Sequence, residues 1–423
     1  MEHATQQTRP RPPAAVPVPA TPAGAGRHLP PSAGFWVVAA AYAALSAFGT
    51  APTPLWTIYQ QVDRFGPLWV TIAFAIMVAG IILSLVFLGH LSDRLGRRRI
   101  IAPALFLTLA AGYVLIAWTG LAGLLTGRLL TGLGVGLMAA SATAYLADLD
   151  RQARPHVTAP KLPGLVAAGA SLGGLALGPL LAGAIAEWLP DPLRTPYVIL
   201  GLLVLVCLAL VLVTPETVDL AAAPRAAAPR MSLRPGRRAV FTGATLLGFA
   251  AFGASGVFSS VGALVIRDDL GIHDVFVGGL ATFAVFGASA AAQLVLGRLG
   301  PRLLTYLGLL CYLAGLAATS VSIANPSLAL FLAAAAVTGA GTGMLFKNGL
   351  SLSAESAAHA SRAGVLSVFF VVAYLGMGLL SITFGLLVGS YGSATTIIVL
   401  SVVLALIAVA GTVLVPARRV PPA

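Results

Sequence analysis

The chain has 423 residues, of which 58% are hydrophobic and 9% charged, and its mean hydropathy is +0.95. Soluble domains carry about 25% charged residues, so a water-soluble fold is excluded. The formal net charge of +12 comes from 25 basic and 13 acidic residues. In a membrane protein such an excess collects in cytoplasmic loops, so it does not indicate a nucleic-acid partner. The two cysteines lie inside apolar runs, which argues against a disulfide framework.

From the N-terminus, residues 1–31 are rich in proline and alanine and contain no apolar run long enough for a signal peptide. We predict a disordered cytoplasmic tail there. Twelve apolar runs follow, each long enough for a helix that crosses a bilayer. The predicted membrane helices cover 34–59, 68–90, 99–118, 121–147, 163–186, 195–213, 239–265, 274–296, 302–322, 327–353, 363–388 and 393–415.

The basic residues predict the orientation of these helices. Twenty of the 25 basic residues fall in segments on the same side of the membrane as the N-terminus. Only Arg64, Arg194 and Arg267 fall on the other side. Since cytoplasmic loops are enriched in lysine and arginine, both termini are predicted to be cytoplasmic, in a multi-pass protein of the cytoplasmic membrane. The remaining two, Arg128 and Lys347, lie within predicted helices.

The two halves of the chain contain a repeat. The run TGLGVGL at 131–137 recurs as TGAGTGM at 338–344, and the same offset carries Asp148 onto Glu355. We therefore predict two six-helix bundles in parallel repeat, an organisation typical of transporters. The predicted boundaries are 32–213 and 239–416 for the bundles, 214–238 for a cytoplasmic linker and 417–423 for a cytoplasmic tail.

The loop between the second and third predicted helices reads GHLSDRLGRRR over 89–99. Its glycines allow a close helix approach and a tight turn, and Asp93 can accept hydrogen bonds from arginines or from a helix N-terminus. This run resembles the loop signature of the major facilitator superfamily, G-x-L-x-D-R-x-G-R-R. The resemblance implies the superfamily fold and a latch that closes the cytoplasmic side against the start of helix 11. The latch residues would be Gly89, Asp93, Arg94, Gly96, Arg97, Arg98, Arg362 and Gly364. The alternative is a plain solvated basic turn.

Predicted helix 4 contains Arg128 followed by a glycine run, which resembles a second signature of the superfamily. A charge facing lipid would cost at least ~3 kcal/mol, so Arg128 is expected to face the bundle interior or a wet cavity. There it would either pin helices through backbone carbonyls, bind an anionic or carbonyl group, or assist proton movement. Lys347 and Asn348 lie in helix 10, the repeat partner of helix 4. Lys347 would either line the cavity or snorkel toward the cytoplasmic interface.

Predicted helix 5 carries Gly174, Gly178, Pro179 and Gly183. This pattern resembles the superfamily signature G-x-x-x-G-P-x-x-x-G, which is associated with exporters and antiporters. Small residues at four-residue spacing also allow plain close packing, and the proline weakens the helix locally. At the end of helix 1, Trp56, Tyr59 and Gln60 form either an interfacial belt or part of the cavity lining.

The predicted function follows from these features. No carboxylate or histidine lies deep in a predicted helix, so a proton carrier is sought at Asp148, Glu355 or Asp93. Two buried cations favour neutral or anionic substrates. No phosphate loop, H-E-x-x-H or metal-ligand spacing is present, so we predict no enzyme and no cofactor.

We predict a secondary transporter of the major facilitator superfamily that exports a small organic molecule, a drug or metabolite, by alternating access, with proton antiport as the candidate coupling. The alternatives are an uptake symporter or uniporter for a sugar or organic anion, and a membrane receptor or scaffold that does not transport. The expected partners are the substrate, the bilayer and protons, for a monomer with no nucleic-acid partner. The alanine and arginine bias is typical of a GC-rich bacterial genome.

Overall fold

The structure is a computed structural model, and it describes residues 29–88, 95–118, 120–157, 161–218, 231–358 and 361–415. These residues are helical apart from short connections and an isolated β-bridge between Leu233 and Ala357. The N-terminal half contains α1 (Pro31–Thr50), α2 (Pro52–Asp63), α3 (Pro67–Leu83), the π-helix η1 (Ser84–Leu88), α5 (Arg97–Ala117), α6 (Leu121–Ala153), α7 (Leu162–Trp188) and α8 (Thr195–Leu212). The C-terminal half contains α9 (Arg238–Asp268), α10 (Val275–Val295), α11 (Pro301–Ala324), α12 (Leu328–Ser356) and α13 (Arg362–Leu414).

Eleven helical segments of the described chain are long and apolar enough to cross a membrane. α1 and α2 form one such segment, because the chain stays helical through Ala51 before Pro52 and Pro54. The 53 residues of α13 are interrupted at Gly392, whose φ of 74° and ψ of 166° are not helical. The last two predicted helices lie on either side of this break. The prediction of an all-α membrane protein is confirmed.

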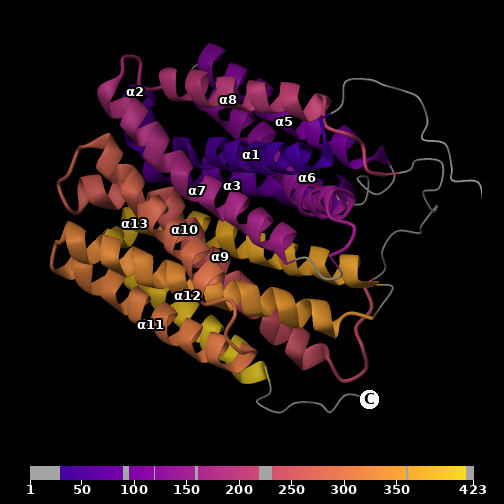
Figure 1. Cartoon of the computed structure of the whole chain (residues 1–423). Coiled ribbons are helices and arrows are strands. Elements are labelled where there is room, and N and C mark those ends of the chain that lie inside the picture. Colours follow the sequence, from indigo (N-terminus) through magenta and orange to yellow (C-terminus); the bar gives the residue numbers. More distant parts are fainter. Residues whose placement is uncertain are drawn as a thin grey trace, which may run out of the picture.

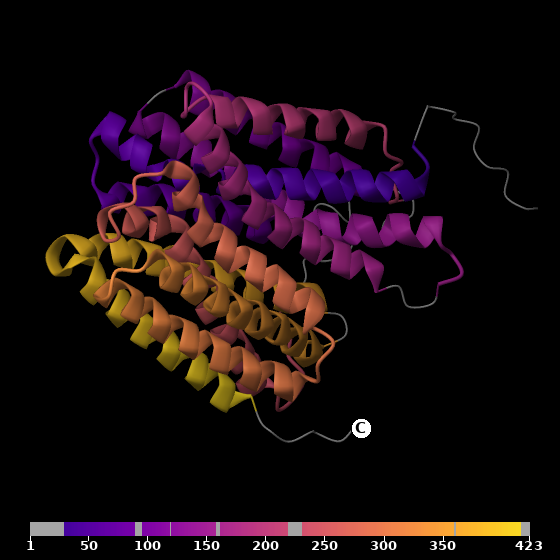
Figure 2. The same cartoon turned by 60° about the vertical axis from the view of Figure 1, so that its left-hand side comes forward.

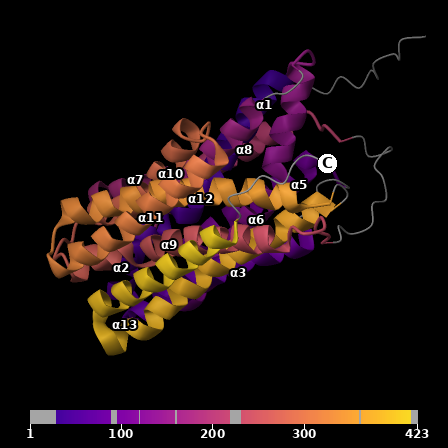
Figure 3. The same ribbon diagram turned by 90° about the horizontal axis from the view of Figure 1, so that it is seen from below.

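The helices pack as two groups that meet along two seams. α1–α8 pack mainly on one another, and α9–α13 do the same. Figure 1 shows the first group in indigo to magenta above the second in orange to yellow. α7 lies against α10 and α3 lies against α13, and these two pairs join the halves. Figure 3 shows the bundle from below, with α13 beside α3.

The repeated glycine runs explain how each half is held together. A side chain at Gly132 of α6 would collide with the carbonyl oxygen of Met77 on α3. The repeat-related Gly339 of α12 faces the carbonyl oxygen of Val285 on α10 in the same way. Small residues allow such close backbone approach between membrane helices. The repeat in the sequence therefore corresponds to one packing device used once in each half.

The two ends of the bundle are named here by the chain ends. The tail side carries Leu29, whose backbone N–H donates to the carbonyl oxygen of Val213 at 2.9 Å. It also carries Val415, the last described residue, whose side chain lies near Gly243 at the start of α9. In Figure 2 this side of the bundle lies toward the right. The opposite side carries the junctions α2–α3, α7–α8 and α9–α10.

Candidate functional site

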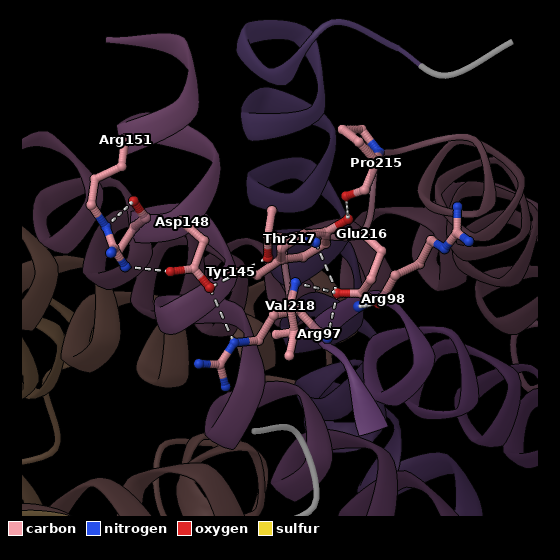
Figure 4. Close-up of polar contacts among 10 residues, drawn as sticks. Arg97, Arg98, Tyr145, Asp148, Arg151, Pro215, Glu216, Thr217 and Val218 are labelled. Atoms are coloured by element: carbon pink, nitrogen blue, oxygen red, sulfur yellow. Dashed lines mark hydrogen bonds and ion pairs between the residues drawn. The ribbon is translucent and has the colours of Figure 1, made fainter. Parts of the chain in front are cut away.

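The tail side carries a polar cluster in which α5 and α6 meet the segment after α8 (Figure 4). Asp148 on α6 accepts a hydrogen bond from Arg97 Nε at 3.2 Å and one from the Thr217 hydroxyl at 3.3 Å. Arg151, one turn further along α6, forms a third contact with the same carboxylate. Asp148 therefore acts as a hub for three side chains and is not a free carboxylate.

Glu216 caps the N-terminus of α5. Its two carboxylate oxygens accept the backbone N–H of Arg97 at 2.9 Å and that of Arg98 at 3.1 Å. The first N–H groups of a helix have no partner within the helix and carry partial positive charge, so a carboxylate there is stabilising. Gly96 precedes this cap with φ +102°, and a Cβ on it would lie 2.5 Å from Glu216 Oε2. The glycine is needed both for its backbone conformation and for the room it leaves.

The segment after α8 is also held by hydrogen bonds to its backbone carbonyls. The guanidinium of Arg98 donates to the carbonyl oxygens of Leu212 at 3.1 Å and Thr214 at 3.0 Å, at the end of α8. The hydroxyl of Tyr145 donates to the Pro215 carbonyl at 2.6 Å. The start of the predicted linker, up to residue 218, is thus fixed to the N-terminal half.

The predicted latch is only partly described. Gly89, Asp93 and Arg94 lie outside the described residues. Gly96, Arg97 and Arg98 take part in the tail-side cluster. Their hydrogen bonds given above join elements of the N-terminal half. The predicted partners on helix 11 lie at the start of α13, where Arg362 is exposed and Gly364 is buried. Glu355, at the tail-side end of α12, is exposed.

Arg128 lies in the N-terminal half with 1% of its surface exposed. Its guanidinium donates to the Gly49 carbonyl at 2.8 Å and contacts Met77 Sδ at 2.7 Å. It also lies over the indole ring of Trp56, 5.5 Å from the ring centre, as a cation–π pair. Among the described residues, neither Arg128 Nε nor Trp56 Nε1 has a hydrogen-bond partner. This position agrees with the prediction that Arg128 faces the interior. Arg128 holds the backbone carbonyl of Gly49, and its Nε remains a donor without a partner among the described residues.

Trp56 and Tyr59 are both buried, so they do not lie at an exposed interfacial belt. The hydroxyl of Tyr59 donates to that of Tyr197 on α8 at 3.1 Å. Gln60 has a different role, because its Oε1 accepts a hydrogen bond from Arg267 of α9 at 3.0 Å. Arg267 also donates to the Thr57 carbonyl at 3.3 Å. This residue therefore reaches from the C-terminal half onto α2 of the N-terminal half.

A second contact joins the halves on the opposite side. Glu187, at the end of α7, accepts the backbone N–H of Val275 at the start of α10, at 2.8 Å. The rings of Trp188 and Phe276 lie beside it with centres 5.3 Å apart. Together with Arg267, these groups fasten the two halves on the opposite side.

The glycine–proline pattern of α7 serves two interfaces. Gly174 and Gly178 pack on the backbone of α1 within the N-terminal half. Pro179 lacks an N–H, so the carbonyl of Leu175 loses its helical partner, and the hydroxyl of Thr50 donates to that carbonyl at 3.0 Å. Gly183 instead faces α10, where its Cβ would lie 3.1 Å from the Val275 carbonyl oxygen.

The α7–α10 seam closes on the opposite side only. A Cβ on Gly279 of α10 would lie 2.6 Å from the carbonyl oxygen of Pro179. Nearer the tail side, Gly287 makes only an ordinary contact, 3.9 Å from Ala176. Gly169 and Gly173, on the same face of α7, have nothing within 4 Å. The seam therefore separates toward the tail side, as the two groups of helices do in Figure 2.

Lys347 and Asn348 occupy the tail-side part of α12. The ammonium group of Lys347 donates to the Gln293 carbonyl near the end of α10, at 3.2 Å, and passes over Gly297. A cation is favourable at such a carbonyl-rich helix end. Asn348 is buried and donates to the hydroxyl of Thr305 on α11 at 2.6 Å. Lys347 therefore borders the end of α10, and Asn348 joins two helices of the same half.

Sequence reasoning missed Glu216, Tyr145, Glu187 and Arg267. Glu216 follows a proline directly after a predicted helix, a place where a carboxylate can cap a neighbouring helix, so a signal was present. Arg267 and Glu187 were visible only as charges next to predicted helix ends. Their partners come from the other half of the chain, and one sequence contains no information on that pairing.

The fold and the seams define a class: a multi-pass helical membrane protein of two helix groups that close on one side. The family model of the Major Facilitator Superfamily matches residues 32–272 and 244–423. The chain belongs to this superfamily, and it is a transporter and not an enzyme.

Solved structures show the same fold. The crystal structure of a bacterial homolog of the human lysosomal transporter Spinster, inward-facing and unoccupied, has a TM-score of 0.65 and 15% identity, covering 94% of this chain and 100% of that one. The inward-facing and occupied form has a TM-score of 0.66 and 16% identity, covering 92% and 97%. No curated protein matches the sequence significantly.

Proposed function

We propose that this protein is a secondary active transporter that exports a small organic molecule across the cytoplasmic membrane by alternating access. The observation that carries the proposal is the seam between α7 and α10, which is tight at Pro179 and Gly279 and empty at Gly169 and Gly173. With the tail side in the cytoplasm, this is an inward-facing state. The outward-facing state requires the contacts of Arg267 and Glu187 across the halves to break.

The proposed topology has twelve transmembrane helices with both termini in the cytoplasm. α13 supplies two of them, because a single span of 53 residues would be about 80 Å long and the hydrocarbon core is about 30 Å thick. The units that move are residues 32–213 and 239–416, joined by the cytoplasmic linker 214–238. The strong bias of basic residues toward the tail side supports this orientation.

Export and proton antiport are the finer parts of the proposal. The glycine–proline pattern of α7 supports export, since it resembles the superfamily signature of exporters and antiporters and lies on the seam. Asp148 and Glu355 are the proposed proton carriers, and Asp148 is paired with Arg97 at the start of α5. Asp93, with the other predicted latch residues, is proposed to hold the cytoplasmic side closed in the outward-facing state. The protein is proposed to act as a monomer in the plasma membrane.

Transport in inside-out membrane vesicles tests the proposal. A substrate found by a thermal-shift screen over drugs, sugars and organic acids should accumulate in the vesicles, and a pH gradient should increase the accumulation. Uptake that only equilibrates the substrate and does not change with the pH gradient removes antiport and favours a uniporter, which the lack of a carboxylate deep in a predicted helix would suit. Arg128→Ala should reduce transport without changing membrane insertion. Unchanged kinetics in that variant would remove Arg128 from the site.

A further inference from the structure

Five aromatic side chains of the C-terminal half form a continuous cluster that takes no part in the predicted latch or in the contacts between the halves described above. Phe252 on α9 lies 4.7 Å from Phe346 on α12 and 5.1 Å from Tyr374 on α13, measured between ring centres. Phe346 also lies 5.5 Å from Phe369 and 6.0 Å from Phe370. Three helices therefore contribute to one aromatic patch, defined here as Phe252, Phe346, Phe369, Phe370 and Tyr374.

The patch faces the space between the halves. Residues 370, 374, 378 and 385 share one face of α13 at helical spacing. Gly385 and Gly378 on this face pack against α3 of the N-terminal half. Toward the tail side, the next positions are Tyr374 and Phe370, and both are half-buried. Contact of α13 with the N-terminal half continues past Gly378 onto η1, and Tyr374 and Phe370 keep part of their surface uncovered beside this contact.

The N-terminal half places hydroxyl groups across from the patch. Tyr374 is close enough to Tyr42 of α1 for the two groups to interact electrostatically. The hydroxyl of Tyr42 lies in turn within hydrogen-bonding reach of Ser171 on α7. At 1.5 Å per residue, these three side chains and Phe346 lie about 13 to 18 Å from the tail-side ends of their helices. The facing groups therefore share one depth near the middle of the bundle.

The charged groups of the described residues lie away from this depth. Lys347 follows Phe346 directly and holds its ammonium group at the end of α10. The described carboxylates lie at helix ends or in connections, from Asp63 to Glu355, and not at this depth. A cationic ligand at this depth would therefore have no described carboxylate to pair with, which disfavours it. Four rings of the patch are half-buried, those of Phe252, Phe346, Phe370 and Tyr374. Ring faces that are not fully covered favour a flat π-system, which stacks at centre distances of about 4.5–7 Å.

We propose that the aromatic patch, completed by Tyr42 and Ser171, binds the substrate of this transporter, and that the substrate is a flat aromatic compound that is uncharged or anionic. The rings of Phe252, Phe346, Phe370 and Tyr374 stack on it, and the hydroxyl groups of the N-terminal half bond its polar substituents. The inference rests on the proposed transport function, because the patch lies in the space that alternating access would expose.

Binding to the purified full-length protein in nanodiscs tests the inference, with empty nanodiscs subtracted. The probes are naphthalene-2-carboxylate, its saturated analogue decahydronaphthalene-2-carboxylate, and 2-naphthylmethylammonium. We expect the aromatic anion to bind more tightly than both other probes. Phe346→Leu and Tyr374→Leu should each weaken its binding about twofold to tenfold, as expected for loss of one stacking ring. Binding of the saturated analogue should not change.

Two further variants control for structure. Phe346→Tyr keeps a ring and should keep the affinity. Phe106→Leu removes a ring on α5 that is 64% exposed and outside the patch, and it should bind as the unmodified protein does. The inference is overturned if the saturated analogue or the ammonium probe binds as tightly as the aromatic anion, if no probe binds, or if the leucine variants keep full affinity.

Spin-label distances across the bundle separate this inference from the proposed function. If the halves rock but binding does not depend on the rings, only the substrate class is wrong. If binding depends on the rings but the halves never rock, alternating access is wrong.

Discussion

The tight approach of α10 to α7 at Gly279 gives a direct test of what holds the opposite side closed. In Gly279→Ala the new methyl group would lie 2.6 Å from the Pro179 carbonyl oxygen and 3.1 Å from its carbon. Both atoms are backbone, so the helices must separate by about 0.8 Å to restore ordinary contact. Overpacking of this kind costs about 1–3 kcal/mol. Because the cost falls on the state with this seam closed, the equilibrium should shift about 5- to 140-fold toward the other state.

Double electron–electron resonance measures this shift. One label pair at Gln61 and Asn325 reports on the opposite side, and a second at Gln152 and Arg298 reports on the tail side; all four positions are exposed. The native Cys207 and Cys311 are first replaced by alanine. In Gly279→Ala the first distance should lengthen and the second shorten.

Gly287→Ala is the matched control for that experiment. It adds the same methyl group on the same helix and the same seam, where the new Cβ would make only an ordinary 3.9 Å contact. For both label pairs, its distance distributions should match those of the protein that keeps Gly287. Unchanged distances in Gly279→Ala, or equal shifts in both variants, would refute the role assigned to the close approach.

Three further predictions concern stability. Glu216→Gln keeps the shape of the α5 cap but removes its charge and one of its two acceptor oxygens, so the free energy of unfolding should fall by about 1–2 kcal/mol in chemical denaturation. Thr50→Val leaves the carbonyl that Pro179 frees without a donor, so unfolding should become easier by about 1–3 kcal/mol in the same assay. Burial raises the pKa of Asp269, beyond the end of α9, so its carboxyl favours folding when protonated; this contribution is complete below the unfolded value of 3.8 and is lost as pH rises through the folded pKa. Asp269→Asn should therefore unfold at a higher temperature than the parent protein at pH 7, and the difference should shrink as the pH falls toward 3.8.

Each of these predictions has its own control. Glu355→Gln changes an exposed carboxylate and should leave the unfolding free energy unaltered. Thr126→Val removes an exposed hydroxyl that bonds only within its own helix, to Ala122, and a loss as large as that of Thr50→Val would show that the proline-freed carbonyl is not special. For Asp269 the pH series is the control, because asparagine can still accept the hydrogen bond from Ser393. A difference in unfolding temperature between Asp269→Asn and the parent protein that stays constant across the pH range would contradict the assigned direction of the pKa shift of Asp269.

The helices could be predicted from the sequence because their signal is local. An apolar run of sufficient length must satisfy its backbone internally within a bilayer, so length and hydropathy place the helix ends to within four residues, except that α6 continues six residues beyond its predicted end at 147. The start of α5 shows where local information ends. Its apolar run predicts a beginning at residue 99, but the helix begins at Arg97, because Glu216 from a distant segment caps it there. The position of that cap depends on tertiary packing.

The sequence indicated which residues belong to the candidate site but not which residues they contact. The cost of a charge in lipid correctly implied that Arg128 is enclosed. The same reasoning could not show that its partners are the Gly49 carbonyl, Met77 and the Trp56 ring, since none of them is a charged residue. Likewise Gln60 drew attention as a polar group at the end of a helix. Its partner Arg267 lies 207 residues away, and only the folded chain brings the two together.

The α7–α10 seam also suggests how one stripe of small residues can serve two states. Gly169 and Gly173 continue the face of α7 that meets α10 at Ala176, and they face open space. On α10, Ala290 and Ala291 follow Gly287 by one turn and are not buried. Close backbone approach needs small residues on both helices, and both retain them beyond the last contact. If the halves rock, the tail-side part of the seam can close by the same kind of packing that now closes the opposite side. Two closed arrangements with similar chemistry have similar free energies, which is the condition for a ligand to shift the balance between them.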